Sequence, residues 1–115
     1  MTLTTAKKLR LLEALLQPYR GHMVTGYLVD ARIQCGCIVG IAYNAWSYQN
    51  GQRIDPTEIV AAVECDGRWL IDTYDHDCFV VVNFHPQGGR RSLHQMIALF
   101  QSAKLVPLPR RCRLQ

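Results

Sequence analysis

The residue types best suited to metal or acid–base chemistry gather in one short stretch near the middle of the chain. Asp72, Asp75, His76 and Asp77 place three carboxylates and one imidazole close together in sequence. Oxygen ligands of this kind bind Mg²⁺ or Mn²⁺, so a metal-dependent enzyme that hydrolyses its substrate is one interpretation. Asp and His are also residues that polar turns favour, and the turn is the preferred interpretation. We therefore predict no catalytic residue and a protein that is not an enzyme.

Thiol chemistry is the second candidate, because the chain has five cysteines: Cys35, Cys37, Cys65, Cys78 and Cys112. Structural zinc sites need close ligand pairs, usually with about two to four intervening residues, and Cys35-x-Cys37 falls on one face of an expected strand. The flanks of Cys78 match no activated-thiol signature. We expect Cys35, Cys37, Cys65 and Cys78 to be small apolar core residues, although a further role for them stays open. No metal and no cofactor are predicted.

The odd number of cysteines, in a chain without a recognisable export signal, indicates a reducing compartment, and we predict a cytoplasmic protein. Hydrophobic residues make up 49% and charged residues 19%, which is typical of a globular protein. No apolar run approaches the roughly 18 residues of a membrane span, so a membrane is not among the expected partners. The length fits a single domain over residues 1–115, with an extended basic tail at 105–115.

Aromatic side chains crowd the longest irregular segment, residues 44–56. Trp46 and Tyr48 lie there with Arg53 close by. Large aromatics in a loop either fold onto the core or contact a partner, and both interpretations stay open. Trp, Tyr and Arg are also enriched among the residues that dominate binding energy at protein interfaces. A protein partner is the leading expectation.

A second group of arginines follows a glycine pair. In Gly88-Gly89-Arg90-Arg91 the arginines come just before an expected helix start, where they could hold a phosphate or an acidic side chain. A solvated loop is the alternative. The predicted partner-binding residues are Trp46, Tyr48, Arg53, Arg90 and Arg91.

The formal charge of +4 is distributed unevenly, with basic ends and an acidic centre. This supports an alternative function, a nucleic-acid-binding module in which the loop aromatics stack on bases and arginines contact phosphates. The residues assigned to that alternative are Arg68, Arg110, Arg111 and Arg113. No known RNA-binding motif is present.

The expected elements begin and end with helices. Residues 5–17 form an amphipathic helix with Leu9, Leu12 and Leu16 on the apolar stripe, which Leu11 and Leu15 widen. Residues 92–104 form the second helix, with Ser92 and Gln95 as a capping box.

Strands are expected at 22–31 and 33–43, separated by a turn at 30–32, and then at 57–65, 68–74 and 78–84. In the strand at 33–43 the odd-numbered residues share one face, and the small, nearly uncharged even-numbered residues share the other. Asp66-Gly67 predicts a two-residue hairpin turn. The last strand is apolar enough to be central. Asp55-Pro56 also has the character of a helix start, so a helix at this point is the alternative.

These elements predict an α+β fold. We expect a small curved antiparallel sheet or partly open barrel of about five strands, flanked by an N-terminal and a C-terminal helix. Free sheet edges and an apolar second face would gain from pairing, so a homodimer is expected.

The run Gly51-Gln52-Arg53-Ile54-Asp55-Pro56-Thr57-Glu58-Ile59-Val60, followed by Asp66-Gly67 and Thr73, resembles short phage and mobile-element accessory proteins. Those proteins carry a Gly-x-x-Ile-x-x-(Ser/Thr)-x-Ile-Val run that enters a hairpin, and anti-CRISPR inhibitors belong to the same size class. The Asp55-Pro56 pair departs from that pattern. The resemblance covers about a quarter of the chain and assigns no residue a role. It implies a non-enzymatic binding protein that inhibits or modulates a bacterial protein complex.

Overall fold

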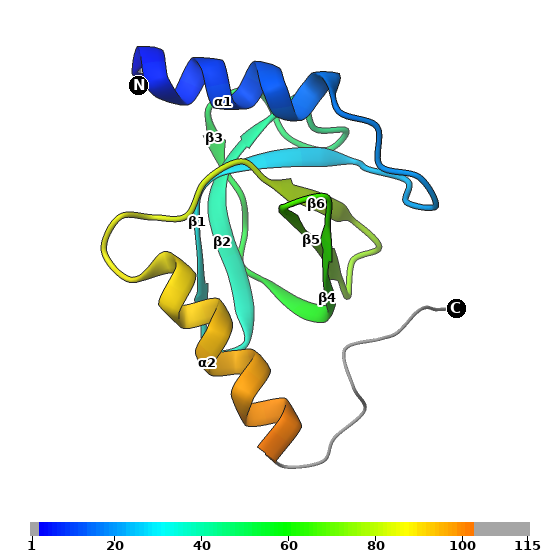
Figure 1. Cartoon of the computed structure of the whole chain (residues 1–115), viewed down its shortest axis with the longest axis vertical. Helices are drawn as coiled ribbons and strands as arrows, with labels where there is room; N and C mark the ends of the chain where they lie inside the picture. The colour runs from blue at the N-terminus through cyan, green and yellow to red at the C-terminus, as the bar shows by residue number, and fades with distance from the viewer. Residues whose placement is uncertain (1–2, 103–115) are drawn as a thin grey trace.

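The computed structural model describes residues 3–102 of the chain. The elements, in order, are α1 (Thr5–Leu16), β1 (Gly26–Gln34), β2 (Cys37–Tyr43), β3 (Gln52–Arg53), β4 (Thr57–Cys65), β5 (Arg68–Thr73), β6 (Cys78–Val81) and α2 (Gly89–Ser102). Figure 1 shows the two helices packed against different parts of the barrel, α1 at the top of the view and α2 at its lower left. The predicted α+β class, with one helix at each end of the strands, is confirmed. The expected tail at 105–115 lies outside the described residues.

Five of the strands form a closed barrel. The hydrogen-bonded order is β1-β6-β5-β4-β2, and β1 also pairs with β2, which closes the ring. The short β3 pairs with β2 at the end of β2 away from β4. Successive strands around the ring are antiparallel, except that β6 and β1 are parallel. An odd number of strands that alternate in direction leaves the first and last pointing the same way, so closing the ring requires one parallel pair.

The strands bury residues on both faces because each helix covers a different side. The interior contains Leu28, Ile38, Ile71 and Phe79, joined by Leu93 of α2. The alternate residues of β1, β5 and β6 point outward and form a second cluster, which includes Val29, Leu70, Val80 and Val82 and which α1 covers. The prediction that the strand beginning at Cys78 is central is confirmed, since β6 lies between β1 and β5.

The hairpin of β4 and β5 follows the sequence prediction. Thr57–Cys65 pairs with Arg68–Thr73, so the strand interpretation after Asp55-Pro56 is correct and the helix alternative is wrong. Asp66 and Gly67 both have positive φ, 51° and 84°, as a type I′ turn requires.

The boundary between the first two strands was predicted wrongly. β1 begins at Gly26, continues through residues 30–32 and ends at Gln34, and the turn consists of Cys35 and Gly36, both with positive φ. At 30–32 the chain forms a bulge, because Asp30 adopts a φ of 55° and exchanges hydrogen bonds with Asn83. Cys35 is therefore an exposed turn residue and not a core cysteine.

The apolar face of α1 also differs from the prediction. Ala14 is fully buried, with Leu11 and Leu15 packed beside it, whereas Leu9, Leu12 and Leu16 are exposed. Thr4 caps the helix by accepting a hydrogen bond from the Lys7 backbone N–H.

The second helix starts three residues earlier than expected, at Gly89. The Gly89 N–H donates to the His85 carbonyl, and the Ser92 N–H to the Gly88 carbonyl, so the first turn has formed before Ser92. Ser92 therefore does not act in a capping box with Gln95. Its hydroxyl donates to the Gly89 carbonyl and accepts from the Ile33 N–H, which ties α2 to β1.

Candidate functional site

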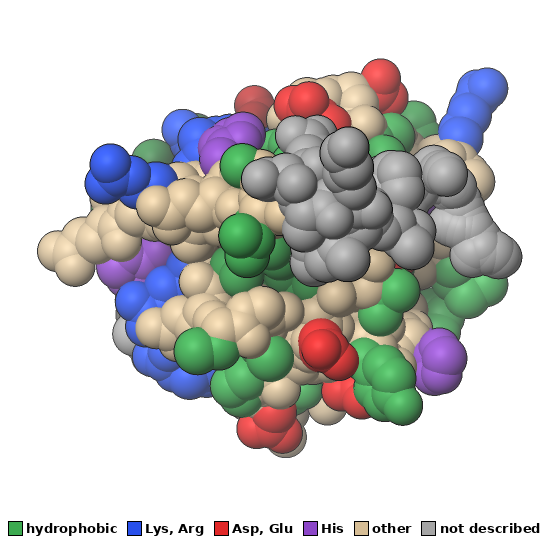
Figure 2. Space-filling model, turned by 90° about the horizontal axis from the view of Figure 1, so that it is seen from below, with side chains coloured by type: hydrophobic (Ala, Val, Ile, Leu, Met, Phe, Trp, Pro, Cys, Tyr) green, Lys and Arg blue, Asp and Glu red, His purple; other side chains and the backbone are tan. Residues whose placement is uncertain are grey.

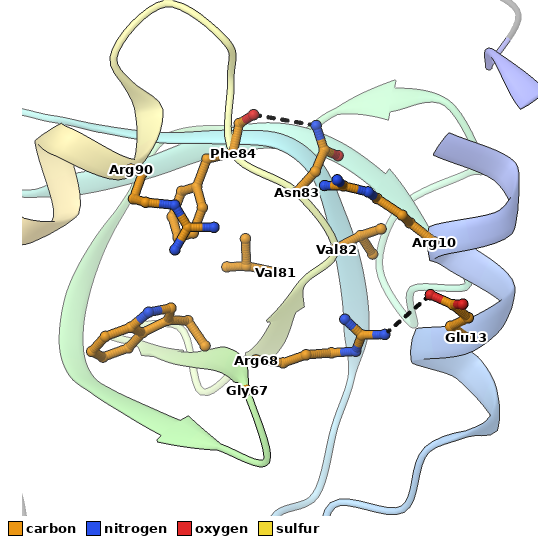
Figure 3. A pocket seen from close by; sticks show the side chains of 10 residues that line it. Arg10, Glu13, Gly67, Arg68, Val81, Val82, Asn83, Phe84 and Arg90 are labelled. Atoms are coloured by element: carbon orange, nitrogen blue, oxygen red, sulfur yellow. Dashed lines mark hydrogen bonds and ion pairs between the residues drawn. The ribbon is translucent and has the colours of Figure 1, made fainter. Parts of the chain in front are cut away.

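A pocket lies where α1, the turn between β4 and β5, the end of β6 and the start of α2 meet (Figure 3). It encloses about 230 Å³. Its polar lining consists of Arg10, Glu13, Arg68, Asn83 and Arg90, and its remaining lining of Gly67, Trp69, Val81, Val82 and Phe84. Three guanidinium groups therefore line one small cavity together with one carboxylate.

Arg68 is the most deeply placed of the three arginines. The tight turn at Asp66-Gly67 makes it the first residue of β5, and its side chain extends toward α1. One terminal nitrogen lies 3.9 Å from a Glu13 carboxylate oxygen, and the Arg68 side chain is 20% exposed. The Nε atom is buried and has no hydrogen-bond partner within residues 3–102. A buried unpaired donor costs on the order of 1–3 kcal/mol, so a ligand oxygen reaching this atom would remove a penalty already present.

Arg90 enters the pocket from the first turn of α2. The carbon of its guanidinium lies 4.6 Å from the centre of the Phe84 ring, a cation–π contact that limits the rotamers of a long side chain. Gly89 allows α2, and with it Arg90, to lie this close to the barrel. It is buried, and a Cβ there would lie 2.5 Å from the Ala31 carbonyl oxygen, so α2 starts in direct backbone contact with β1. Gly89 thus allows the helix to begin close to the barrel.

Arg10 completes the arginine set from α1, one helical turn before Glu13. In Figure 3 its side chain extends away from the helix toward Asn83. Within the described part of the chain, Arg10 and Arg90 have no salt bridge, and the one salt bridge of Arg68 is the long contact with Glu13. The Tyr19 phenol also lies beside Arg68; burial raises the pKa of that phenol, and the nearby guanidinium opposes the rise. The pocket therefore carries an excess of positive charge.

The polar wall at Asn83 is held by a network behind it. The Asn83 amide donates to Asp30 at 2.9 Å and accepts from the Asp30 N–H, and Lys7 lies 3.0 Å from the same carboxylate. Burial raises the pKa of the Asp30 carboxyl, but the hydrogen bonds from Asn83 and Lys7, with the Lys7 charge, outweigh it and hold the pKa below its ordinary value. Asp30 is thus already paired and does not neutralise the pocket.

Two predicted residues from different hypotheses meet in this pocket. Arg90 was assigned to a protein partner and Arg68 to nucleic acid, and the fold brings them together. Arg90 and Arg91 are both exposed, but only Arg90 lines the pocket. Arg110, Arg111 and Arg113 lie outside the described residues.

The predicted aromatic anchors lie elsewhere. Trp46 is 70% exposed, and its backbone N–H donates to the carbonyl of Thr25, just before β1, whereas Gly89 packs against Ala31 further along that strand. Six residues of strand correspond to roughly 20 Å. Arg53 is exposed on β3. The structure therefore does not gather the predicted partner-binding residues onto one site.

Tyr48, unlike Trp46, covers the core. It is half-buried against the interior cluster, and its hydroxyl accepts a hydrogen bond from the Asp55 N–H. Burial raises the pKa of this phenol. The two aromatics of the loop thus have different roles, one packed and one exposed.

The acidic stretch at 72–77 forms a structured turn. The Asp77 carboxylate accepts a hydrogen bond from the Thr25 hydroxyl at 2.8 Å, and its N–H donates to the Thr73 hydroxyl. Across residues 3–102, no three His, Cys, Asp or Glu side chains are grouped so that they could hold a metal ion. Burial, with the nearby Asp72 and Asp77 carboxylates, raises the pKa of the Cys78 thiol, which keeps it protonated.

Sequence reasoning missed Arg10, Trp69 and Phe84 as site residues. The sequence assigned Arg10 no role, and Trp69 and Phe84 fell within the expected strands at 68–74 and 78–84. Trp69 forms one wall and contacts His94 edge to face, with ring centres 6.3 Å apart. One feature of the sequence could have indicated this site. Arg68 and Arg90 each lie at the start of an expected strand or helix, and the ends of such elements meet at the rim of a barrel.

In comparisons with known proteins, no family model, curated protein or solved structure matches this chain. The fold and the site define an α+β barrel protein with an arginine-lined pocket. Within the described part of the chain, no helix is long and apolar enough to span a membrane.

Proposed function

We propose that this protein is a non-enzymatic binding protein and that its arginine pocket holds an acidic side chain of a partner protein. The observation that carries the proposal is the buried, unpaired Nε of Arg68, with Arg10 and Arg90 beside it and one distant carboxylate among them. Guanidinium groups bind carboxylates through paired hydrogen bonds, and they do so most strongly where water is excluded.

The size of the pocket supports a group carried by a larger partner. Pockets for free small-molecule ligands usually measure about 300–1,000 Å³. The 230 Å³ here falls below that range and is sufficient for one carboxylate-bearing side chain. The apolar floor of Val81 and Val82 would contact the methylene groups of that side chain.

The distribution of charge supports a protein partner over nucleic acid. Residues 3–102 contain nine Lys and Arg and nine Asp and Glu, so the whole excess of +4 comes from residues 103–115. Figure 2 shows one face on which most basic side chains gather at one side, while acidic side chains lie at the top, at the bottom and within the lower right part. Nucleic-acid-binding surfaces carry a broad basic stripe, whereas a neutral domain with one basic pocket suits a single acidic group.

The resemblance of residues 51–60 to phage and mobile-element accessory proteins suggests the kind of partner. On that basis we propose that the partner belongs to a bacterial protein complex that this protein inhibits or modulates, as anti-CRISPR proteins do. The exposed Trp46 would serve as a second, separate contact.

The test is affinity capture from a nuclease-treated bacterial lysate with matched variants. Arg68→Met and Arg90→Met remove charge but keep the apolar part of each side chain, and Arg91→Met is the control one residue away. We expect the full-length chain and Arg91→Met to retain the same discrete protein, and the two pocket variants to lose it.

Two results would overturn the proposal. Equal retention by all four chains would mean that the pocket is not the contact. Retention only when nuclease is omitted, with affinity falling steeply as salt rises, would assign the function to nucleic acid.

A further inference from the structure

Helix α1 carries a second apolar face that the barrel does not use. Leu9, Leu12 and Leu16 are 57%, 55% and 84% exposed, while Leu11, Ala14 and Leu15 make the contact with the barrel. In Figure 1 the outer side of α1 faces away from the rest of the fold. Isolated exposed leucines are common, but three aligned on one helix face mark an interaction surface.

The spacing of these leucines is that of a coiled-coil seam. Separations of three and then four residues place Leu9, Leu12 and Leu16 at successive a, d and a positions of a heptad. Lys8 then falls at a g position and Glu13 at the following e position, on opposite borders of the seam. In a parallel two-stranded pair, each g residue faces the e residue five positions later on the other helix. Lys8 of one chain would therefore face Glu13 of the other, and the two-fold symmetry would form this pair twice in the dimer.

We propose that α1 is the interface of a parallel, two-fold symmetric dimer of this chain. The seam is complementary to a second copy of itself in charge. An antiparallel pair would instead bring g positions against g positions and e positions against e positions, so Lys8 would not face Glu13 in that arrangement. The proposal assigns the expected homodimer to a helix face, because closure of the barrel removes the free sheet edges that such pairing would need.

The dimer should be weak. The helix has 12 residues, fewer than two heptads, and one such helix pair buries less than the roughly 1,200–2,000 Å² of a stable interface. We expect association in the range of about 10–500 µM, reversible on dilution.

Sedimentation equilibrium of the full chain over that concentration range tests the proposal. The average mass should rise from that of a monomer toward that of a dimer, and Leu12→Gln should abolish the rise. Because Leu12 is exposed, its variant should keep its thermal midpoint, and Leu9→Gln provides a second variant if it does not. Neither variant touches the arginine pocket, so loss of the dimer and loss of partner capture are separable.

A charge exchange tests the parallel arrangement. Lys8→Glu alone and Glu13→Lys alone should each weaken the dimer about three- to tenfold at low salt, and the double variant should restore it. An equimolar mixture of the two single variants should form heterodimers. A monomer at every concentration overturns the proposal, as does a dimer that Leu12→Gln leaves intact. Binding to anionic vesicles that requires Leu12, with no dimer, would assign the face to a membrane instead.

Discussion

The guanidinium of Arg90 lies over the ring of Phe84, with 4.6 Å between its central carbon and the ring centre. This contact holds a long, mobile side chain at the mouth of a pocket to which two other elements contribute Arg10 and Arg68. The backbone contact of Gly89 with β1 sets the position of the helix that carries Arg90. The site is thus partly organised before any ligand arrives.

Replacing the Phe84 ring should weaken anion binding without removing a charge. We expect Phe84→Leu to lower the affinity for a tri-glutamate peptide about two- to fivefold, since a partly exposed cation–π contact contributes roughly 0.5–1 kcal/mol. Isothermal titration calorimetry would measure the change. Phe84→Tyr, which keeps the ring, is the control and should bind like the original chain. Equal affinity in all three chains would contradict the role given to this contact.

Neutralising the pocket carboxylate should have the opposite effect. Glu13→Gln leaves three guanidinium groups with no competing carboxylate, so the same peptide should bind about two- to fivefold more tightly at low salt. The gain should shrink as salt rises. The titrations should be made at protein concentrations below those at which the chain dimerises, because Glu13 also borders the seam of α1. Weaker binding in Glu13→Gln would show that the carboxylate helps to position Arg68.

The Asp30 network predicts a specific acid sensitivity. Because the pKa of Asp30 is lowered in the folded protein, its contribution to stability is full above the unfolded pKa of about 3.9 and is lost as pH falls through the folded pKa. Chemical denaturation from pH 7 to pH 2 should show this loss.

The matched variant is Lys7→Met, which removes the ammonium group from the network. The variant should lower the free energy of unfolding by about 0.5–1 kcal/mol at pH 7. Its free energy of unfolding should also fall less steeply as the pH is lowered. If the free energy of unfolding falls as steeply with decreasing pH as in the original chain, Lys7 does not hold the pKa of Asp30 down.

The two loop aromatics should respond differently to truncation. Trp46→Ala should change the free energy of unfolding by less than about 0.5 kcal/mol, because its side chain is mostly exposed. Tyr48→Ala should cost about 2–4 kcal/mol, since it removes a ring from the interior cluster and the acceptor of the Asp55 N–H. Urea denaturation of both variants measures the difference. A large cost at Trp46 would mean that its ring also covers the core.

The sequence predicts the fold best where local chemistry determines it. The Asp66-Gly67 turn was enough to place the β4–β5 hairpin, because both residues tolerate positive φ. The bulge at Asp30 could not be predicted in this way. Its positive φ accompanies hydrogen bonds to Asn83, 53 residues away, so the same residues resembled an ordinary turn.

The same distinction applies to the site. Arg68 and Arg90 were recognisable as candidate contact residues, but their convergence with Arg10 depends on barrel closure and on the packing of both helices. The face of α1 was predicted wrongly because the helix has leucines on two sides. Periodicity alone does not say which side the barrel covers, and the side with Ala14 allows the closer approach.

The central claim is that Arg68 lies ready to bind an anionic oxygen, and nuclear magnetic resonance of the arginine Nε–H groups tests it most directly. In a titration with tri-glutamate, the Arg68 Nε–H signal should shift and saturate, Arg90→Met should abolish the shift, and Arg91→Met should leave it unchanged. A small, unsaturated shift shared by every arginine would contradict the claim, because it would indicate general charge attraction at the surface.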